Sequence, residues 1–134
     1  MRRRTDKERG VIAVEFAIVF PLLALIFFGI VQFGIAFSKY EVYTGAAREG
    51  ARFAAVRCAP LRTNGCLPGD ISNKVISAAA GYAITGTPTG SIVCSGSTVG
   101  QSVTVSWTQS IAISIPFWKN VTATPTISAV FRCE

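Results

Sequence analysis

The sequence contains no histidine and few charged residues. Among its 134 residues, 13 are Lys or Arg, 7 are Asp or Glu, and none is His. Without histidine the chain cannot form a Ser-His-Asp or Cys-His catalytic set, and zinc sites that combine cysteine with histidine are excluded. A site with cysteine ligands alone is the one such zinc arrangement left open. The composition therefore indicates a protein that is not an enzyme and carries no cofactor.

Acidic residues are scarce in the second part of the chain. Beyond residue 40 there are four, namely Glu41, Glu49, Asp70 and Glu134. None looks paired with another in the way that two-carboxylate hydrolysis requires. The glycines between residues 81 and 100 lie among Thr and Ser, which is typical of turns and not of a phosphate-binding loop. We expect no catalytic, cofactor-binding or metal-binding residue.

Basic residues are concentrated at the N-terminus. Residues 1–10 hold five Arg or Lys and two acids, whereas residues 11–134 hold eight and five. No stripe of Lys and Arg alternates with aromatics in the body of the chain, so we expect no nucleic-acid partner. A short basic flank beside an apolar helix indicates the cytoplasmic side of a membrane. We therefore predict that residues 1–10 form a basic cytoplasmic leader, disordered over 1–9.

A long apolar run follows the leader, with the sequence GVIAVEFAIVFPLLALIFFGIVQFGIAF from Gly10 to Phe37. No charged residue occurs from Phe16 to Ser38, a span of 23 residues. As a helix this span would be about 34 Å long, enough to cross a hydrocarbon core of about 30 Å. Pro21 should kink it mildly. A conventional signal peptide has an apolar region of only about 7–15 residues, so release of a soluble protein by cleavage after Ala36 is a weaker alternative.

The helix is predicted to continue beyond the membrane, over residues 11–57. Apolar residues recur every three or four positions on one face of this extension, namely Tyr40, Tyr43, Ala47, Ala51 and Ala54. Glu49 and Arg52 would form an ion pair one turn apart. The chain thus divides into the leader, this helix and an exported head at residues 58–134.

The head is predicted to be α+β, with one short helix and an antiparallel sheet of three or four strands. Asp70 should cap a helix from Ile71 to Ala83, with a buried stripe of Ile71, Val75, Ala78, Ala79 and Tyr82. Apolar residues then alternate with polar ones in three stretches, which read Val103-Val105-Trp107, Ile111-Ile113-Ile115 and Ile127-Ala129-Phe131. We interpret these as a meander of three long strands, with Ser91–Cys94 as a short additional strand. Phe117 and Trp118 would either cover the core at a turn or form an exposed contact patch.

Four cysteines, Cys58, Cys66, Cys94 and Cys133, all follow the apolar run. A small exported domain commonly joins an even number of cysteines as disulfides. Three pairings are open. We favour Cys94–Cys133, which would join two late segments, together with Cys58–Cys66, which would close a short loop.

Glu15 is a carboxylate at the start of the apolar run. Such a group costs about 2.5–3.5 kcal/mol at the centre of a membrane helix and less near the interface. Glu15 could extend to the lipid headgroups, or it could meet a cationic partner. If the chain were cut after Gly10, the new amino group of Val11 would lie one helical turn from Glu15. It could then pair with Glu15 of its own or a neighbouring subunit.

The residues from Gly10 onward resemble a known family. The basic leader, Gly10, four residues and then Glu15-Phe16 resemble the class III signal of type IV pilins in its Flp/Tad variant. More narrowly, the stretch resembles the TadE-like family of the tight-adherence pilus system. The shared positions are Gly10, Val14, Glu15, Phe16, Ala17, Pro21, Gly29, Gly34, Ala46, Ala47, Arg48, Gly50, Ala51 and Arg52.

This resemblance implies a minor pilin or pseudopilin with a pilin-like transmembrane helix. A prepilin peptidase would cut between Gly10 and Val11, and Glu15 with Phe16 would act in assembly. The implied partners are that peptidase, the major Flp pilin, another TadE/TadF-type pseudopilin, the inner-membrane platform and membrane lipid. The protein would cross the bacterial inner membrane once, with a periplasmic head, and act in pilus assembly, adherence or secretion. The alternative is an uncleaved anchor whose head binds a ligand or partner.

Overall fold

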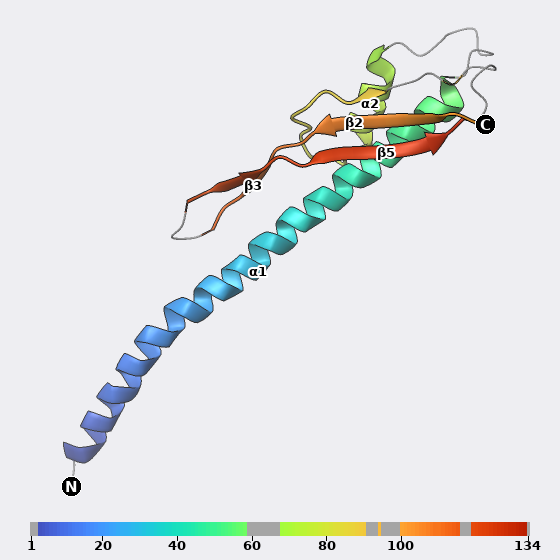
Figure 1. Ribbon diagram of the computed structural model, residues 1–134. Helices are drawn as coiled ribbons and strands as arrows, with labels where there is room; N and C mark the ends of the chain where they lie inside the picture. The colour runs from blue at the N-terminus through green and yellow to red at the C-terminus, as the bar shows by residue number, and fades with distance from the viewer. Residues whose placement is uncertain (1–2, 59–67, 91–93, 95–99, 116–118, 134) are drawn as a thin grey trace.

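The computed structural model describes residues 3–58, 68–90, 94, 100–115 and 119–133. These residues form two helices, α1 (Arg3–Arg57) and α2 (Pro68–Ala78). They also form five strands, β1 (Thr89–Gly90), β2 (Ser102–Thr108), β3 (Ile111–Ile113), β4 (Val121–Ala123) and β5 (Thr126–Arg132). The arrangement is α+β, with a long N-terminal helix, a short helix and antiparallel sheets, as predicted (Figure 1).

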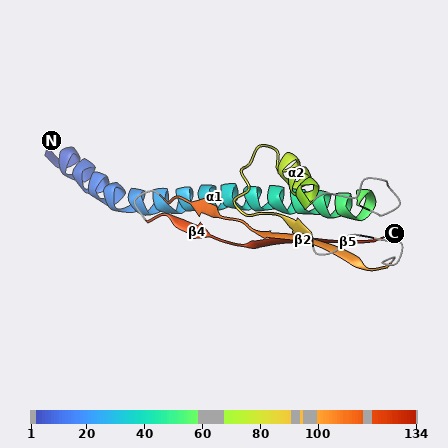
Figure 2. The same ribbon diagram turned by 90° about the horizontal axis from the view of Figure 1, so that it is seen from above.

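Helix α1 is continuous over 55 residues, which corresponds to a length of about 80 Å. The prediction that residues 1–9 are disordered is wrong from residue 3 onward, because the helix begins at Arg3. Arg, Lys and Glu, which make up most of the charged residues of this segment, are good helix formers, and no proline interrupts them. Pro21 lies inside the helix, and the N-terminal, blue part of α1 is bent relative to the rest (Figures 1 and 2). A bend is expected near a proline because its ring removes one backbone hydrogen bond.

The strands form one long antiparallel hairpin with an extra strand at one edge. The three-stranded sheet has the order β1-β2-β5, and β3 pairs with β4. Thr108 lies opposite Thr126 and Ile111 lies opposite Ala123, so the register continues unchanged from β2–β5 into β3–β4. The predicted meander of three adjacent long strands is therefore wrong. The third alternating stretch pairs with the first, while the second forms β3 in the extension of the hairpin.

The break between the two parts of the hairpin follows from Pro125. Unchanged register places Gln109 opposite Pro125, and the Gln109 amide donates to the Pro125 carbonyl at 3.0 Å. Proline has no N–H to return that bond, so the ladder is interrupted there.

Helix α2 is shorter than predicted and begins earlier. It starts at Pro68, which puts Asp70 in its first turn instead of at the cap, and it ends at Ala78 instead of Ala83. Ala80 and Gly81 have φ of 52° and 86°, a left-handed conformation that ends a helix. The predicted stripe is confirmed at Ile71, Val75 and Ala79, whereas Tyr82 is 41% exposed because it follows the helix.

The core lies where the C-terminal half of α1 meets α2 and the three-stranded sheet (Figure 2). Helix α1 contributes small side chains, with Ala47, Ala51 and Ala54 fully buried, and the predicted face is wrong only at Tyr40, which is 39% exposed. The alternating pattern is confirmed at the buried strand residues, which are Val103, Val105, Trp107, Ile111, Ile127 and Ala129. The remaining members of the pattern, Ile113, Ile115 and Phe131, are only half-buried.

Gly50 lies at the closest approach between α1 and the rest of the head. A Cβ atom at this position would overlap the Val75 Cγ2 methyl of α2 and would lie 3.7 Å from Val105 Cγ1 of β2. Next to this contact, the Lys74 ammonium lies 3.3 Å from the Glu49 carboxylate. The predicted pair of Glu49 with Arg52 is thus replaced by an ion pair between the two helices.

Gln109 is a buried polar residue that joins the sheet to the loop after α2. Its Oε1 accepts hydrogen bonds from the Trp107 Nε1 (3.0 Å) and the Thr85 amide (3.2 Å). Its Nε2 donates to the carbonyls of Ala83 and Ser110, each at 3.2 Å. The amide of Ser110 donates to the Thr85 hydroxyl at 2.8 Å. Every polar atom of the Gln109 side chain is therefore paired, which makes its burial tolerable.

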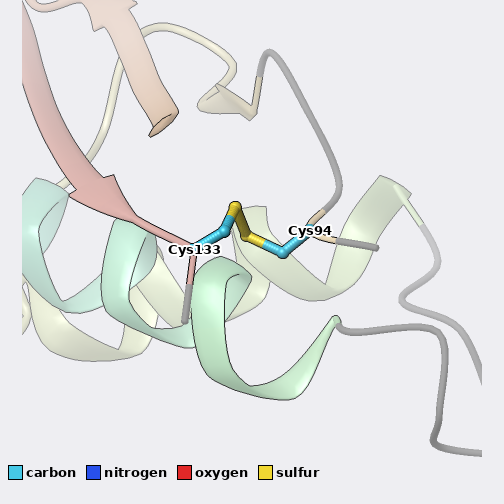
Figure 3. Close-up of a disulfide and its surroundings, with 2 residues drawn as sticks. All are labelled: Cys94 and Cys133. Carbon is cyan, nitrogen blue, oxygen red and sulfur yellow. A yellow bond between two sulfur atoms is a disulfide. The ribbon is translucent and has the colours of Figure 1, made fainter. Parts of the chain in front are cut away.

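A disulfide joins Cys94 to Cys133 just beyond β5 (Figure 3). This is one of the two pairs favoured from the sequence, and it closes a loop between residues 39 positions apart. Cys58 is buried and disulfide-bonded as well. The predicted partner Cys66, the strand over 91–93 and the pair Phe117 and Trp118 lie outside the described residues.

We predict that Gly50→Ala lowers the free energy of unfolding by about 1–2 kcal/mol. Overpacking costs about 1–3 kcal/mol, and the gain in helix propensity offsets up to about 1 kcal/mol of it. Gly45→Ala is the matched control, because Gly45 lies in the same helix and nothing is within 4 Å of its Cβ position. It should raise stability by about 0.5–1 kcal/mol. Denaturant unfolding in detergent, followed by circular dichroism, measures both, and equal effects would contradict the close contact.

We predict that Gln109→Leu lowers the free energy of unfolding by about 2–4 kcal/mol, because it leaves the Trp107 indole N–H and backbone groups of the loop buried without partners. Ser110→Ala is the control, since the hydrogen bonds of Ser110 described above use its backbone. That variant should change stability by less than about 0.5 kcal/mol. Tryptophan fluorescence during unfolding reports both, and a neutral Gln109→Leu would contradict the role of this network.

Candidate assembly site

The N-terminal half of α1 projects from the head and is covered by almost nothing. We call the part from Gly10 to Ser38 the stem. Its large apolar residues are exposed, with Ile18 at 72% and Phe33 at 68%. Monomeric soluble proteins rarely expose a continuous apolar surface of this size. The stem therefore needs either lipid or other helices around it.

The stem is also the part of the chain that could cross a membrane. Within the described residues, α1 is the one helix long and apolar enough to do so. Its most apolar window of 18 residues has a mean hydropathy of 2.7, and none of that window is buried. Because apolar residues occur on every side of the stem, it differs from a surface helix with one apolar face. A single-pass membrane helix fits these properties.

Gly10 and Val11 lie within α1 at the start of the stem. Gly10 is exposed, and nothing lies within 4 Å of the position that a Cβ would take. Val11 is 67% exposed. A protease that cuts between them must unwind the helix locally. Glycine makes this unwinding easier, because a glycine inside a helix lowers the stability of the helix by about 1 kcal/mol relative to alanine.

Glu15 lies one turn beyond Val11 on the same face of the helix, because residues four apart are neighbours on an α-helix. Glu15 lines a shallow, open hollow together with Ile12, Phe16 and Val19. Among the side chains described from Gly10 onward, none forms an ion pair with it. An exposed carboxylate in apolar surroundings gains from a cation of a neighbouring molecule or of its own chain.

Phe16 adds a flat apolar surface beside this carboxylate. It is 64% exposed, and its ring stacks on that of Phe20 with centroids 5.4 Å apart. The structure thus brings all four predicted residues, Gly10, Val11, Glu15 and Phe16, within two turns of one exposed helix. The Cys94–Cys133 pair lies in the head and takes no part in this surface.

The junction between stem and head is held by Tyr43, which lies five residues beyond the uncharged run. Its hydroxyl donates to the Ala83 carbonyl at 3.1 Å, and its ring packs edge-on against Tyr82. Burial, and secondarily Tyr82, raise the pKa of Tyr43 above its usual value, so the hydroxyl stays protonated as a donor. The loop that holds Gln109 is therefore also fixed to α1.

Sequence reasoning missed Gln109 and the Tyr43–Ala83 hydrogen bond. Gln109 could have been found, because it continues the period-two series of inward positions after Trp107, where a polar residue needs buried partners. Nothing in the sequence indicates that Ala83 supplies a carbonyl to Tyr43. The residues described by the structure include no cluster of three His, Cys, Asp or Glu side chains that could hold a metal ion.

Comparison with known proteins gives one match. No curated protein and no solved structure matches the chain. A family model described as TadE-like protein matches residues 10–52, about a third of the chain. The matched segment contains the entire stem and the following part of α1 as far as Arg52, including Gly50. The resemblance inferred from the residues is thereby confirmed over this segment, which is typical of proteins associated with the Tad pilus.

Proposed function

We propose that the protein is a minor pilin or pseudopilin of a Tad (Flp-type) pilus, processed by a prepilin peptidase after Gly10. The observation that carries this proposal is the TadE-like segment, which here is an exposed apolar stem with Gly10, Val11 and Glu15 at its start. The protein acts in assembly, adherence or secretion and has no catalytic role.

We infer the membrane arrangement from the basic leader at the N-terminal end of the stem. The basic leader stays in the cytoplasm, the stem crosses the inner membrane once, and the disulfide-containing head lies in the periplasm. From there the processed subunit can enter an extracellular pilus. Its partners are the peptidase, the major Flp pilin, a second TadE/TadF-type pseudopilin, the inner-membrane platform and membrane lipid.

The head supports a minor role over that of a bulk subunit. A filament whose main subunit is little more than a helix packs its stems tightly, and the folded head of this chain would occupy much more space around each stem. A few copies at one end or at the membrane base are compatible with such packing.

We predict that Gly10→Glu blocks processing and that Gly10→Ala does not. A peptidase that accepts only a small residue before the cut cannot seat a long charged one. The measurement is the N-terminal sequence of protein extracted from membranes of the native host, with and without the candidate peptidase. A wild-type chain that starts at Val11 only when the peptidase is present supports the proposal. Normal cleavage of Gly10→Glu would contradict it.

We predict that Glu15→Ala leaves processing intact but lowers the amount of protein in sheared filaments about tenfold. An ion pair with the Val11 amino group of the same or a neighbouring subunit that contributes about 1.4 kcal/mol changes an equilibrium tenfold. Glu41→Ala is the control, because Glu41 is an exposed carboxylate of α1 outside the uncharged run. Quantitative immunoblots of filament and membrane fractions measure the ratio. Wild-type filament levels of Glu15→Ala would refute the pairing.

The second candidate is an uncleaved single-pass anchor whose periplasmic head binds a ligand or envelope partner. The exposed apolar stem fits this role equally well, because a plain anchor needs nothing else. It predicts that Met1 is retained with and without the peptidase. The N-terminal sequence therefore separates the two candidates in a single experiment.

A further inference from the structure

Strand β5 forms one edge of the three-stranded sheet. The strand order is β1-β2-β5, so β5 has β2 on one side, and no described strand lies on the other. Helix α1 packs against it, whereas the side chains of Thr126, Ser128, Val130 and Arg132 are exposed. Within the described residues, this edge of the seven-residue strand therefore has no strand partner.

The backbone groups that face this edge can be identified. Gln109 donates to Pro125, and the Cys133 amide donates to the Gln101 carbonyl at 2.8 Å, so each of these opposite pairs is hydrogen-bonded. Hydrogen-bonded and non-hydrogen-bonded pairs alternate along an antiparallel ladder. The bonded β5 residues between these ends are therefore 127, 129 and 131. It follows that residues 126, 128, 130 and 132 direct their N–H and C=O groups toward the open edge.

The edge lacks the devices that usually prevent strand pairing. Natural edge strands are short, bulged, or interrupted by charges and proline. The only charge in β5 is Arg132 at its end, Pro125 precedes the strand, and Val130 near its centre is 63% exposed. Such a strand is a template for the strand of another chain.

We propose that the free edge of β5 pairs with the β1 edge of a second copy of this chain. Helix α1 and β5 run in the same direction (Figures 1 and 2). Antiparallel pairing of two β5 strands would point the two stems in opposite directions, which copies inserted alike in one membrane cannot do. The proposal rests on this common membrane orientation and not on cleavage after Gly10.

Strand β1 satisfies the directional requirement, and although it is two residues long and follows Pro88, its Gly90 supplies the one N–H and C=O pair that this contact uses. Both β1 and β5 are antiparallel to β2, so they run the same way, and their pairing between copies is parallel. Odd-numbered residues of β2 direct their backbone groups toward β5, so even-numbered residues such as Ser106 direct theirs toward β1. Ser106 therefore forms a hydrogen-bonded pair with Thr89, which lies opposite it. The next residue of β1, Gly90, directs its N–H and C=O away from β2, toward the outer edge of the sheet. Gly90 can then bridge the Ser128 carbonyl and the Val130 amide of the next copy. Such a head-to-tail contact repeats and produces a row of subunits with parallel stems.

The test is site-specific crosslinking of full-length protein in membranes. Two tagged copies are expressed together, one with Thr89→Cys and the other with Ser128→Cys, and are treated with a short bismaleimide. The described native cysteines are all disulfide-bonded and do not react. We expect a crosslink between the Thr89→Cys copy and the Ser128→Cys copy. Its yield should be at least tenfold higher than that of a crosslink between two copies of the same variant. Two outcomes would overturn the proposal. One is a crosslink between two Ser128→Cys copies with a yield equal to that of the mixed crosslink, and the other is a mixed crosslink whose yield is no higher when Thr89→Cys is used than when Asn73→Cys on α2 replaces it.

Proline variants provide a matched control for the hydrogen bonds themselves. Val130→Pro removes an N–H that faces the open edge, so we expect the mixed crosslink to fall at least tenfold while the melting temperature of the head is retained. Ala129→Pro removes an N–H that bonds to Val105, so it should lower the melting temperature instead. An undiminished crosslink in a folded Val130→Pro variant would overturn the proposal. N-terminal sequencing of the same samples reports separately on the proposed processing.

Discussion

The close approach of α1 to α2 and β2 at Gly50 is the contact on which the head depends. Only a residue without a side chain allows the Val75 methyl to reach the helix backbone, and the neighbouring alanines keep the helix surface thin on both sides. Small residues let the two helices and the sheet share one closely packed core, since dispersion and apolar burial both need direct contact. Because the contact is made by a continuous helix, it also sets the direction in which the stem leaves the head.

The same helix therefore serves two environments. Its C-terminal half has one buried face and one exposed face, as in any globular domain, whereas the stem is apolar on all sides. Between them, the hydrogen bond from Tyr43 to Ala83 and the Gln109 network connect α1 to the hairpin through one loop. Helix α1 and the sheet are thus joined by paired, partly buried polar groups as well as by the apolar core.

Stem and sheet edge offer two different ways of joining subunits. Helix packing in lipid depends on van der Waals contact and on pairing of the few polar groups, of which Glu15 is the main one. Strand addition depends on backbone hydrogen bonds, which are directional and largely independent of side chains. Because α1 and β5 run in the same direction, both kinds of contact can repeat along one array. A subunit that is present in few copies could in this way have neighbours of its own kind while its stem joins other proteins.

Much of this protein could be predicted from its sequence, because the deciding signals are local. The uncharged run gives the stem, the period-two series gives the inward faces of β2 and β5, and the set of positions from Gly10 to Arg52 gives the family resemblance. Local chemistry also placed Glu15 one turn from Val11, since helical spacing needs no tertiary information.

Tertiary structure decided what depends on residues far apart in the chain. Strand order was one such feature, because β5 pairs with β2 only when β3 and β4 fold back as an extension of the same hairpin. The partner of Glu49 and the role of Gln109 were others, since each depends on a group from a distant segment. Periodicity assigns a residue to a face, but the partner on that face is set by packing, which no local pattern contains.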